Sequence, residues 1–223
     1  NSIWLNDKSL ITELKKKIDN DVFSENDANC FSLSEALDGA ARHYNIVFGI
    51  ILGSGCGGGL VINKKIVSGA NGLGGEWSLN QMPLKEIKSN IDNNVKFDFS
   101  QRIEGHLSGK SIEKKFNTLF KKKLTAKEIF SKYRDKDADA SNFIISYKEN
   151  LARSLVIIIT TIDPDAIVFG GGVSNEIDFL DELKSMSAKL LNEKSLKTVF
   201  LKPIYGDASG VRGAALLGRQ NLI

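Results

Sequence analysis

The residues whose chemistry is easiest to recognise lie in a glycine-dense loop, Gly53 to Gly59, between two short apolar runs. Those runs, Ile46 to Leu52 and Leu60 to Ile62, are too short and too β-branched for helices, so we predict strand, loop and strand. Glycines at alternating positions permit positive φ angles, which would gather backbone N–H groups into a nest for an anion, typically phosphate. No Lys-Ser or Lys-Thr pair follows, so this is not a Walker loop. A plain glycine-rich hairpin is the alternative.

An Asn26-Asp27 pair precedes a predicted helix that runs from about Ala28 to Tyr44. The Asp27 carboxylate could act as a general base on a substrate hydroxyl while Asn26 hydrogen-bonds a neighbouring hydroxyl. Phosphoryl transfer needs little more from a protein than such a group, together with preorganised donors and Mg²⁺ for the phosphates. The alternative is that Asp27 only caps its helix, as the Asp of a lone Asn-Asp pair usually does.

A glycine triplet, Gly170-Gly171-Gly172, follows a predicted buried strand, Ala166 to Phe169. This places the triplet outside the carboxyl end of a strand and at a helix start, where α/β sheets bind nucleotides. A glycine triplet at such a turn is a weak signal when taken alone.

The elements that position these residues alternate between helix, glycine turn and strand, which indicates an α/β fold. Helical spacing of apolar residues predicts a first helix that ends near Asn20, and a long helix with apolar residues from Phe143 to Ile159, stopped by Asp163-Pro164. We further predict short strands at 22–23, 66–67 and 199–201, helices at 112–120, 126–133 and 211–217, and a helix capped by Ser174 that runs to about Leu191.

Composition and charge argue against several classes of function. The chain has 223 residues, a mass of 24.5 kDa and a net charge of +3, and its lysine clusters at 15–17 and 121–123 read as solvated helical faces. We find no concentrated basic face or nucleic-acid module, and no apolar run long enough for a membrane span. Cys30 and Cys56 have no paired spacing, so we expect reduced thiols and a cytoplasmic protein.

Five motifs occur in order along the chain: Glu25-Asn26-Asp27-Ala28-Asn29-Cys30, the glycine loop, Gly69-Ala70-Asn71-Gly72-Leu73-Gly74-Gly75-Glu76-Trp77, Asp163-Pro164-Asp165 with the later glycine triplet, and Gly206-Asp207-Ala208-Ser209-Gly210-Val211-Arg212-Gly213. In this order they resemble the ROK family (repressors, open reading frames and kinases) over nearly the whole chain. Within that family the chain looks most like bacterial fructokinases, with N-acetylglucosamine kinases next. The resemblance implies the large lobe of an actin-like ATPase, or ribonuclease H-like, hexokinase-type fold with a remnant of the small lobe.

The resemblance also implies roles for particular residues in the ATP-dependent phosphorylation of a hexose. Asp27 would be the catalytic base, and Asn26, Asn71, Glu76 and Glu104 would bind the sugar, since a carboxylate accepts two hydroxyl donors at once. The nucleotide, ATP with Mg²⁺, would contact Gly53, Ser54, Gly55 and Gly57 through its phosphates and Gly170, Gly171 and Gly172 at its adenosine. Each of these residues taken alone is most often an ordinary polar or turn residue.

One departure from the family concerns zinc. ROK proteins commonly hold a zinc ion with one His and three Cys, but the matching positions here are Leu79, Val95, Phe97 and Arg102. Structural zinc needs four N or S ligands, so we expect no stoichiometric zinc. Because the family's zinc histidine also touches the sugar, Leu79 leaves the identity of the sugar open.

A second departure concerns the start of the chain, where the family's opening hairpin with its Asp-x-Gly-Gly-Thr phosphate loop has no counterpart. We therefore expect residues 1–27 to be the remnant of a small lobe and crossover, 28–208 the large lobe, and 209–223 a helix that packs on the missing lobe. Such a chain would bind nucleotide or hexose weakly and be inactive alone. The alternative function is a sugar-binding module of a ROK-type regulator or a degenerate kinase. Family members are often homodimers, although no interface is visible in the sequence.

Overall fold

A five-stranded mixed sheet forms the centre of the protein in a computed structural model that describes residues 9–18, 20–83 and 101–221. The strand order is β3-β2-β1-β4-β5. β1 (Ile46–Leu52), β2 (Cys56–Ile62) and β3 (Lys65–Ile66) are antiparallel neighbours, and β4 (Ala166–Gly170) and β5 (Val199–Leu201) extend the sheet in parallel from β1. The α/β class predicted from the sequence is confirmed.

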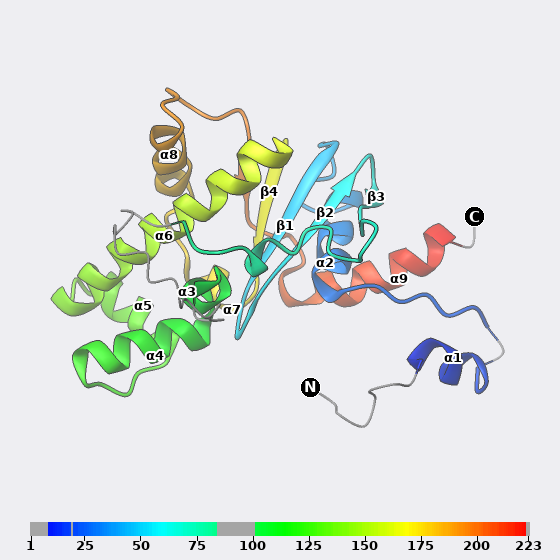
Figure 1. Cartoon of the computed structure of the whole chain (residues 1–223), viewed down its shortest axis with the longest axis horizontal. Helices are drawn as coiled ribbons and strands as arrows, with labels where there is room; N and C mark the ends of the chain where they lie inside the picture. The colour runs from blue at the N-terminus through cyan, green and yellow to red at the C-terminus, as the bar shows by residue number, and fades with distance from the viewer. Residues whose placement is uncertain (1–8, 19, 84–100, 222–223) are drawn as a thin grey trace, which may run out of the picture.

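Helices cover both faces of this sheet (Figure 1). One side holds α2 (Asp27–Leu37) and α9 (Ser209–Asn221), and the short α1 (Leu10–Lys15) precedes them in the chain. The other side holds α3 (Glu104–Leu107), α4 (Gly109–Phe120), α5 (Ala126–Arg134), α6 (Ala138–Ile162), α7 (Gly172–Glu176) and α8 (Leu180–Leu190). Two 3₁₀ turns, η2 (Trp77–Leu79) and η4 (Gly206–Ala208), complete the described elements that bear on the site.

Alternating residues of the central strands divide the core into two clusters. Val47 and Val168 face α2, where they pack with Phe31. Phe48 and Phe169 point the other way into a larger cluster with the helices from α3 to α8. None of the helices in the described part of the chain combines the length and apolar character that a bilayer crossing requires.

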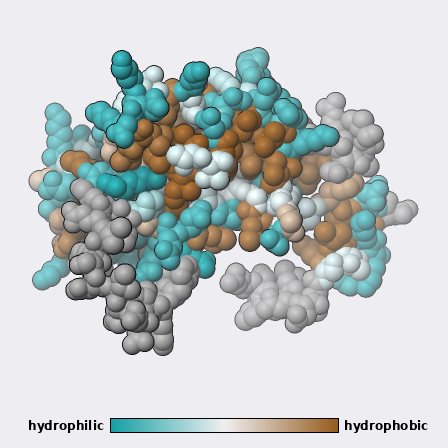
Figure 2. Space-filling view, turned by 45° about the horizontal axis from the view of Figure 1, so that its top comes forward, coloured by the Kyte–Doolittle hydropathy of each residue, from teal (hydrophilic) through white to brown (hydrophobic). Residues whose placement is uncertain are grey.

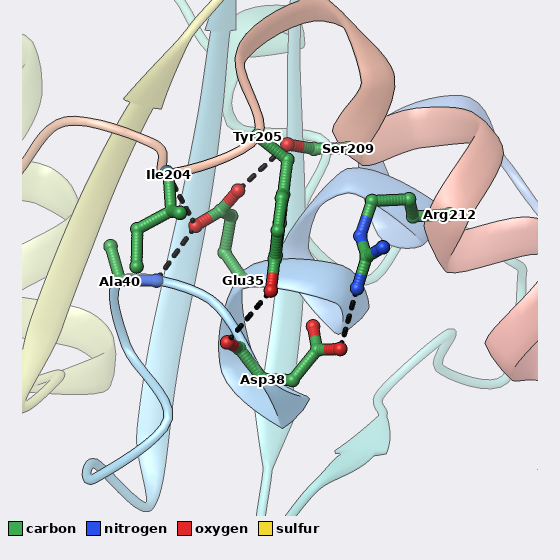
Figure 3. Close-up of polar contacts among 7 residues, drawn as sticks. All are labelled: Glu35, Asp38, Ala40, Ile204, Tyr205, Ser209 and Arg212. Carbon is green, nitrogen blue, oxygen red and sulfur yellow. Dashed lines mark hydrogen bonds and ion pairs between the residues drawn. The ribbon is translucent and has the colours of Figure 1, made fainter.

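Helix α9 is fastened to α2 by a buried carboxylate (Figure 3). Glu35 is 0% exposed. Its Oε2 accepts hydrogen bonds from the backbone N–H groups of Ala40 (2.8 Å) and Ile204 (3.2 Å), and its Oε1 accepts one from the Ser209 hydroxyl (2.7 Å). Gly213 of α9 packs against the Cys30 carbonyl with no space for a Cβ. The end of the chain is therefore docked on the helix that begins at Asp27.

Five sequence-based element predictions were wrong. Helix α1 ends at Lys15 and not near Asn20, and the predicted glycine loop is already strand from Cys56 onward. Residues 22–23 form no strand. Helix α2 ends at Leu37, well before Tyr44, because the Glu35 carboxylate binds the N–H of Ala40 and turns the chain there. The helix predicted from Ser174 to Leu191 is two helices, separated where the buried Ile177 takes an extended conformation, and Ser174 lies inside α7 without capping it.

Candidate functional site

The N-terminus of α2 presents Asp27 to solvent and uses its neighbour as the cap. Asn26 is the N-cap residue, and its Oδ1 accepts a hydrogen bond of 2.8 Å from the N–H of Ala28. Asp27 is the first helical residue, and its Oδ1 accepts from the same N–H at 2.8 Å. Since Asn26 already supplies a cap, the capping requirement does not by itself explain an acidic side chain at Asp27.

Glu76 meets this helix end from the loop that follows β3. The Asn26 amide donates to Glu76 Oε1 at 3.1 Å. Two neighbours of Glu76 hold it on β2: the indole of Trp77 donates to the Gly57 carbonyl (2.9 Å) and the hydroxyl of Ser78 to the Cys56 carbonyl (2.9 Å). Gly75 allows this close approach, because its φ is +88° and a Cβ there would lie 2.7 Å from the Cα of Gly59.

Glu104 reaches the same region at the start of α3. The segments on either side of residues 84–100 are paired, with hydrogen bonds from Ile103 N–H to the Asn80 carbonyl (2.9 Å) and from Met82 N–H to the Gln101 carbonyl (2.8 Å). This pairing places Glu104 beside the β1–β2 turn, where a Cβ on Gly55 would lie 2.8 Å from Glu104 Oε1. Two segments far apart in the sequence therefore meet at this turn.

The Glu76 carboxylate lies in the electrostatic field of two other carboxylates, Asp27 and Glu104. Partial burial raises the pKa of Glu76 above its ordinary value, and the negative charges of Asp27 and Glu104 raise it further. A group of hydrogen-bond acceptors with like charge suits a neutral ligand that brings several hydroxyl donors. It also suits a proton transfer, because neighbouring negative charges make it easier for one of the carboxylates to accept a proton.

The glycines of the β1–β2 region serve packing, and the predicted positive-φ nest is wrong. None of the described positive-φ residues falls between Gly53 and Gly59. A Cβ on Gly59 would lie 2.5 Å from the Ala28 carbonyl oxygen, and one on Gly57 would lie 3.3 Å from the Ala28 Cβ, so these glycines let α2 lie close on β2. At the turn tip, Ser54 and Gly55 line a cavity, and contact of Gly53, Ser54, Gly55 and Gly57 with phosphate stays a prediction.

A large cavity begins at this turn. It measures about 1220 Å³, and the described residues that line it include Ser54, Gly55 and Glu104 at one end. Helix α4 contributes three lysines, Lys110, Lys114 and Lys115, along its wall. Desolvation lowers the pKa of Lys115 to about 8. A cavity of this size can hold a nucleotide-sized molecule, and ammonium groups favour an anionic one.

Two of the three glycines at the end of β4, Gly170 to Gly172, are required by packing. A Cβ on Gly171, whose φ is +88°, would lie 2.5 Å from the Leu52 carbonyl oxygen, and one on Gly170 would lie 2.5 Å from the Phe31 ring. Gly172 has no atom within 4 Å of its ideal Cβ position. Of the triplet, Gly172 is thus the residue with room for a ligand, and the adenosine contact stays a prediction.

Asn71 is exposed in the loop from Ser68 to Gly75. Leu79 is 37% exposed and, with Glu76, Trp77 and part of α6, lines a second cavity of about 370 Å³. Figure 2 shows apolar groups gathered across the middle of the face turned toward the viewer, with polar groups around them. The sugar-binding role of Asn71 stays a prediction.

The described residues contain no group of three or more His, Cys, Asp or Glu side chains placed to hold a metal ion. Of the four positions that match the family's zinc ligands, Val95 and Phe97 lie outside the described residues. Cys30 and Cys56 are free thiols. Burial raises the pKa of both, so both remain protonated and weakly reactive near neutral pH.

Three polar residues next to the site were not predicted from the sequence. Glu25 accepts hydrogen bonds from Asn29 and Ser68 and also from the backbone N–H of Asn26. The signal available in the sequence was the spacing of Glu25 and Asn29, which lie four residues apart across a helix start.

The chain is similar to known proteins over nearly its whole length. The model of the ROK family matches residues 1–221. The chain belongs to the ROK family. Among curated relatives, the N-acetyl-D-glucosamine kinase of Histophilus somni is 38% identical over 217 residues, covering 94% of this chain and 70% of the relative. That of Mannheimia succiniciproducens is 39% identical over 216 residues, covering 94% and 71%.

Solved structures of ROK proteins share the fold. A ROK hexokinase from Thermus thermophilus superposes with a TM-score of 0.81 at 22% identity, covering 95% of this chain and 70% of that chain. A ROK glucokinase from Streptomyces griseus, in complex with glucose and AMPPNP, gives 0.76 at 24% identity, covering 95% and 72%. The ROK resemblance and the actin-like ATPase fold inferred from the sequence are confirmed. The curated relatives carry the name that the sequence analysis placed second, after fructokinase.

Proposed function

We propose that this ROK protein transfers the γ-phosphoryl group of ATP to a hydroxyl of a hexose, with N-acetylglucosamine as the first candidate. The observation that carries the proposal is the meeting of Asn26-Asp27, Glu76 and Glu104 beside the Ser54–Gly55 turn. Glu104, a member of this group, lines one end of the cavity whose wall also carries the three lysines of α4.

In this proposal Asp27 is the general base. Its carboxylate takes the proton of the attacking sugar hydroxyl while that oxygen bonds to the γ-phosphorus. The bond between the γ-phosphorus and the bridging oxygen breaks at the same centre, and ADP leaves with the electron pair. Asp27 suits the task because it stands exposed at a helix end whose cap is supplied by Asn26.

The other polar residues orient the sugar. Glu76 and Glu104 each accept hydroxyl donors, and Asn26 fixes Glu76 by its amide. Asn71 joins them from the loop tip. A hexose that lacks one of the expected hydroxyls would leave a buried acceptor unpaired, which is how such a site discriminates.

The nucleotide lies on the other side of the transferred group. We propose that Gly53, Ser54, Gly55 and Gly57 border its phosphates and that Gly170, Gly171 and Gly172 border its adenosine. Mg²⁺ would enter with ATP and balance the charge of its phosphates, since the described residues offer no ready-made metal site. The three lysines of α4 raise the positive potential of the cavity wall.

The name of the sugar follows from the relatives more than from single residues. The curated relatives named here are N-acetyl-D-glucosamine kinases at 38% and 39% identity. One solved structure with the same fold is described as a putative N-acetylmannosamine kinase from Listeria monocytogenes. The apolar cavity at Leu79 and Trp77 could accept the methyl group of an N-acetyl substituent. An N-acetylhexosamine is therefore preferred to fructose, the first choice from sequence.

The experiment is an ADP-release assay on the longest product of the gene, with ATP, Mg²⁺ and one hexose at a time: N-acetylglucosamine, N-acetylmannosamine, glucose, mannose or fructose. We expect the highest kcat/KM with an N-acetylhexosamine. Preference for fructose would restore the first choice. Hexose binding by calorimetry without turnover would support a sugar-binding module instead of a kinase.

The same assay tests whether residues 1–223 act alone. The matched part of the relatives is about 70% of their length. We propose that the remainder supplies groups needed for in-line transfer, since a misplacement of about 1 Å can cost 10²-fold in rate. We expect turnover from the longer product and only weak ligand binding from residues 1–223. Equal kcat for the two would refute this part of the proposal.

A further inference from the structure

Glu25 contacts Asn26, one of the residues proposed to bind sugar, through a hydrogen bond. Its carboxylate accepts three hydrogen bonds: from the Asn26 N–H (2.8 Å) and the Asn29 amide (3.0 Å) at Oε1, and from the Ser68 hydroxyl (2.7 Å) at Oε2. Asn26 and Asn29 belong to the start of α2, whereas Ser68 begins the loop that leads to Glu76. One side chain therefore joins two segments that are more than forty residues apart in sequence.

These contacts close a ring around the site. The loop that starts at Ser68 is closed on itself by a hydrogen bond from the Gly74 N–H to the Ser68 carbonyl (2.8 Å). Two residues later Glu76 accepts from the Asn26 amide, and Asn26 returns to Glu25 through its backbone N–H. Removing Glu25 would leave the Asn26–Glu76 bond as the direct polar link between these two segments.

The charge of Glu25 fits this role. Burial tends to raise the pKa of its carboxyl, but the hydrogen bonds from Ser68, Asn29 and Asn26 outweigh burial and hold the pKa below its ordinary value. Glu25 is therefore ionised at neutral pH, when each of its three donors is best satisfied. With about three of its four acceptor positions filled by protein donors, it has little capacity left for a ligand.

We propose that Glu25 is a positioning residue for the sugar site: it holds the loop from Ser68 to Glu76 against the start of α2, so that Asp27 and Glu76 face the same sugar. This rests on the proposed function for the identity of the ligand. The geometric part of the proposal, a tether between the loop and the helix, does not depend on whether the protein has kinase activity. Glu25 itself touches neither the sugar nor the phosphate in this proposal.

Kinetics of matched variants test the functional part, in the longest product of the gene. Glu25→Ala should raise the KM for hexose about 10- to 100-fold, the range for lost hydrogen bonds to a charged group, while the KM for ATP changes by less than about twofold. Ser68→Ala removes the loop arm alone and should give a smaller rise. Glu25→Gln should stay near wild type, because an amide can accept from Asn26 and Asn29 and donate to the Ser68 oxygen. Glu193→Ala, an exposed glutamate after α8, is the control.

Amide hydrogen exchange tests the tether without any activity. In Glu25→Ala and Ser68→Ala, peptides covering Ser68 to Trp77 should exchange faster than in wild type, while peptides of α8 should not change and Glu25→Gln should restore protection. Unchanged exchange of this loop in Glu25→Ala overturns the proposal even in an active kinase. An unaltered hexose KM in that variant, or an equal rise in the KM for ATP, would overturn the sugar-positioning role. A wild-type protein without turnover would refute only the proposed function, and the exchange result would still decide the tether.

Discussion

The two ends of helix α2 hold carboxylates in opposite situations. At the start, Asp27 is exposed and shares its surroundings with Glu76 and Glu104, two more negative groups. At the end, Glu35 is fully buried, and its carboxylate accepts hydrogen bonds from Ala40, Ile204 and Ser209 (Figure 3). The first arrangement is electrostatically unfavourable until a ligand arrives, and the second is satisfied by the protein itself.

The backbone around the second end is satisfied in the same way. The ammonium of Lys64 donates to the carbonyl oxygens of Ala36 (2.8 Å), Arg42 (2.6 Å) and Tyr44 (3.0 Å), where the C-terminal end of a helix favours a cation. The difference between the ends teaches that one short helix serves two purposes. Its far end fixes the fold, and in the proposed function its near end keeps acceptors for the sugar.

Asp27→Asn should break the functional end with the largest effect. Asn keeps the size of the side chain but cannot take a proton, so kcat should fall by roughly 10²- to 10⁴-fold with a smaller change in the hexose KM. Steady-state kinetics with the preferred hexose would measure it. Stability should change little, because Asn26 still caps the helix, and a variant with wild-type kcat would make Asp27 a structural residue only.

Glu35→Ala should break the structural end. It leaves two backbone N–H groups and the Ser209 hydroxyl without their acceptor, at roughly 1–3 kcal/mol for each unpaired donor, so we expect the free energy of unfolding to fall by at least about 3 kcal/mol. Urea unfolding would measure the loss. Glu35→Gln is the matched control, because its amide can accept from Ala40 and Ile204 and donate to Ser209.

The two conservative variants then separate the two ends of the helix. Glu35→Gln should keep stability near wild type, whereas Asp27→Asn should not keep activity. If Glu35→Gln were as unstable as Glu35→Ala, the negative charge itself, and not the hydrogen bonds, would hold α9 in place.

Gly213→Ala should loosen the docking of α9 by a smaller amount. A Cβ at Gly213 would overlap the backbone of Cys30, so α9 must shift from α2, at a cost of about 1–3 kcal/mol typical of overpacking. Gly218→Ala is the control on the same helix, because nothing lies within 4 Å of its ideal Cβ position. There the helical preference of alanine should stabilise the protein slightly. Thermal unfolding of both variants would show opposite shifts, and equal shifts would contradict this packing.

Much of the fold could be predicted from the sequence because its strands are apolar and its motifs occur in order. The runs that became β1, β4 and β5 and the four-residue spacing of α6 were predicted correctly. The end of α2 was not, since it depends on the carboxylate of Glu35 meeting Ala40 and a loop some 170 residues away. Periodicity does not report a long-range hydrogen bond.

The candidate site shows the same division. The Asn26-Asp27 pair pointed to Asp27, the resemblance to the ROK family pointed to Glu76 and Glu104, and the structure brings the three carboxylates together. The sequence reasoning gave the wrong role to the glycines of β2. A glycine that allows a neighbouring helix to pack closely and a glycine that turns the chain look the same in a sequence. Glu25 was overlooked because its role depends on Ser68, whose position becomes visible only when the loop is folded on α2.

Two glutamates at the functional end should change stability with pH in opposite directions, the smallest effect expected here. The folded pKa of Glu76 lies above its unfolded value near 4.5, so between those pKa values the folded state binds more protons and the free energy of unfolding falls as pH rises. The folded pKa of Glu25 lies below 4.5, so its contribution is present above that pH and is lost as pH falls through the folded pKa. Urea unfolding across pH 3 to 7 should therefore show Glu76→Gln gaining stability relative to wild type as pH rises from about 4.5. Glu25→Gln keeps the hydrogen bonds but not the charge, so its free energy of unfolding should be slightly below that of wild type at the upper end of that range, and the difference should vanish as pH falls. Two variants that track each other in sign would show that burial and the charges of Asp27 and Glu104 do not raise the pKa of Glu76.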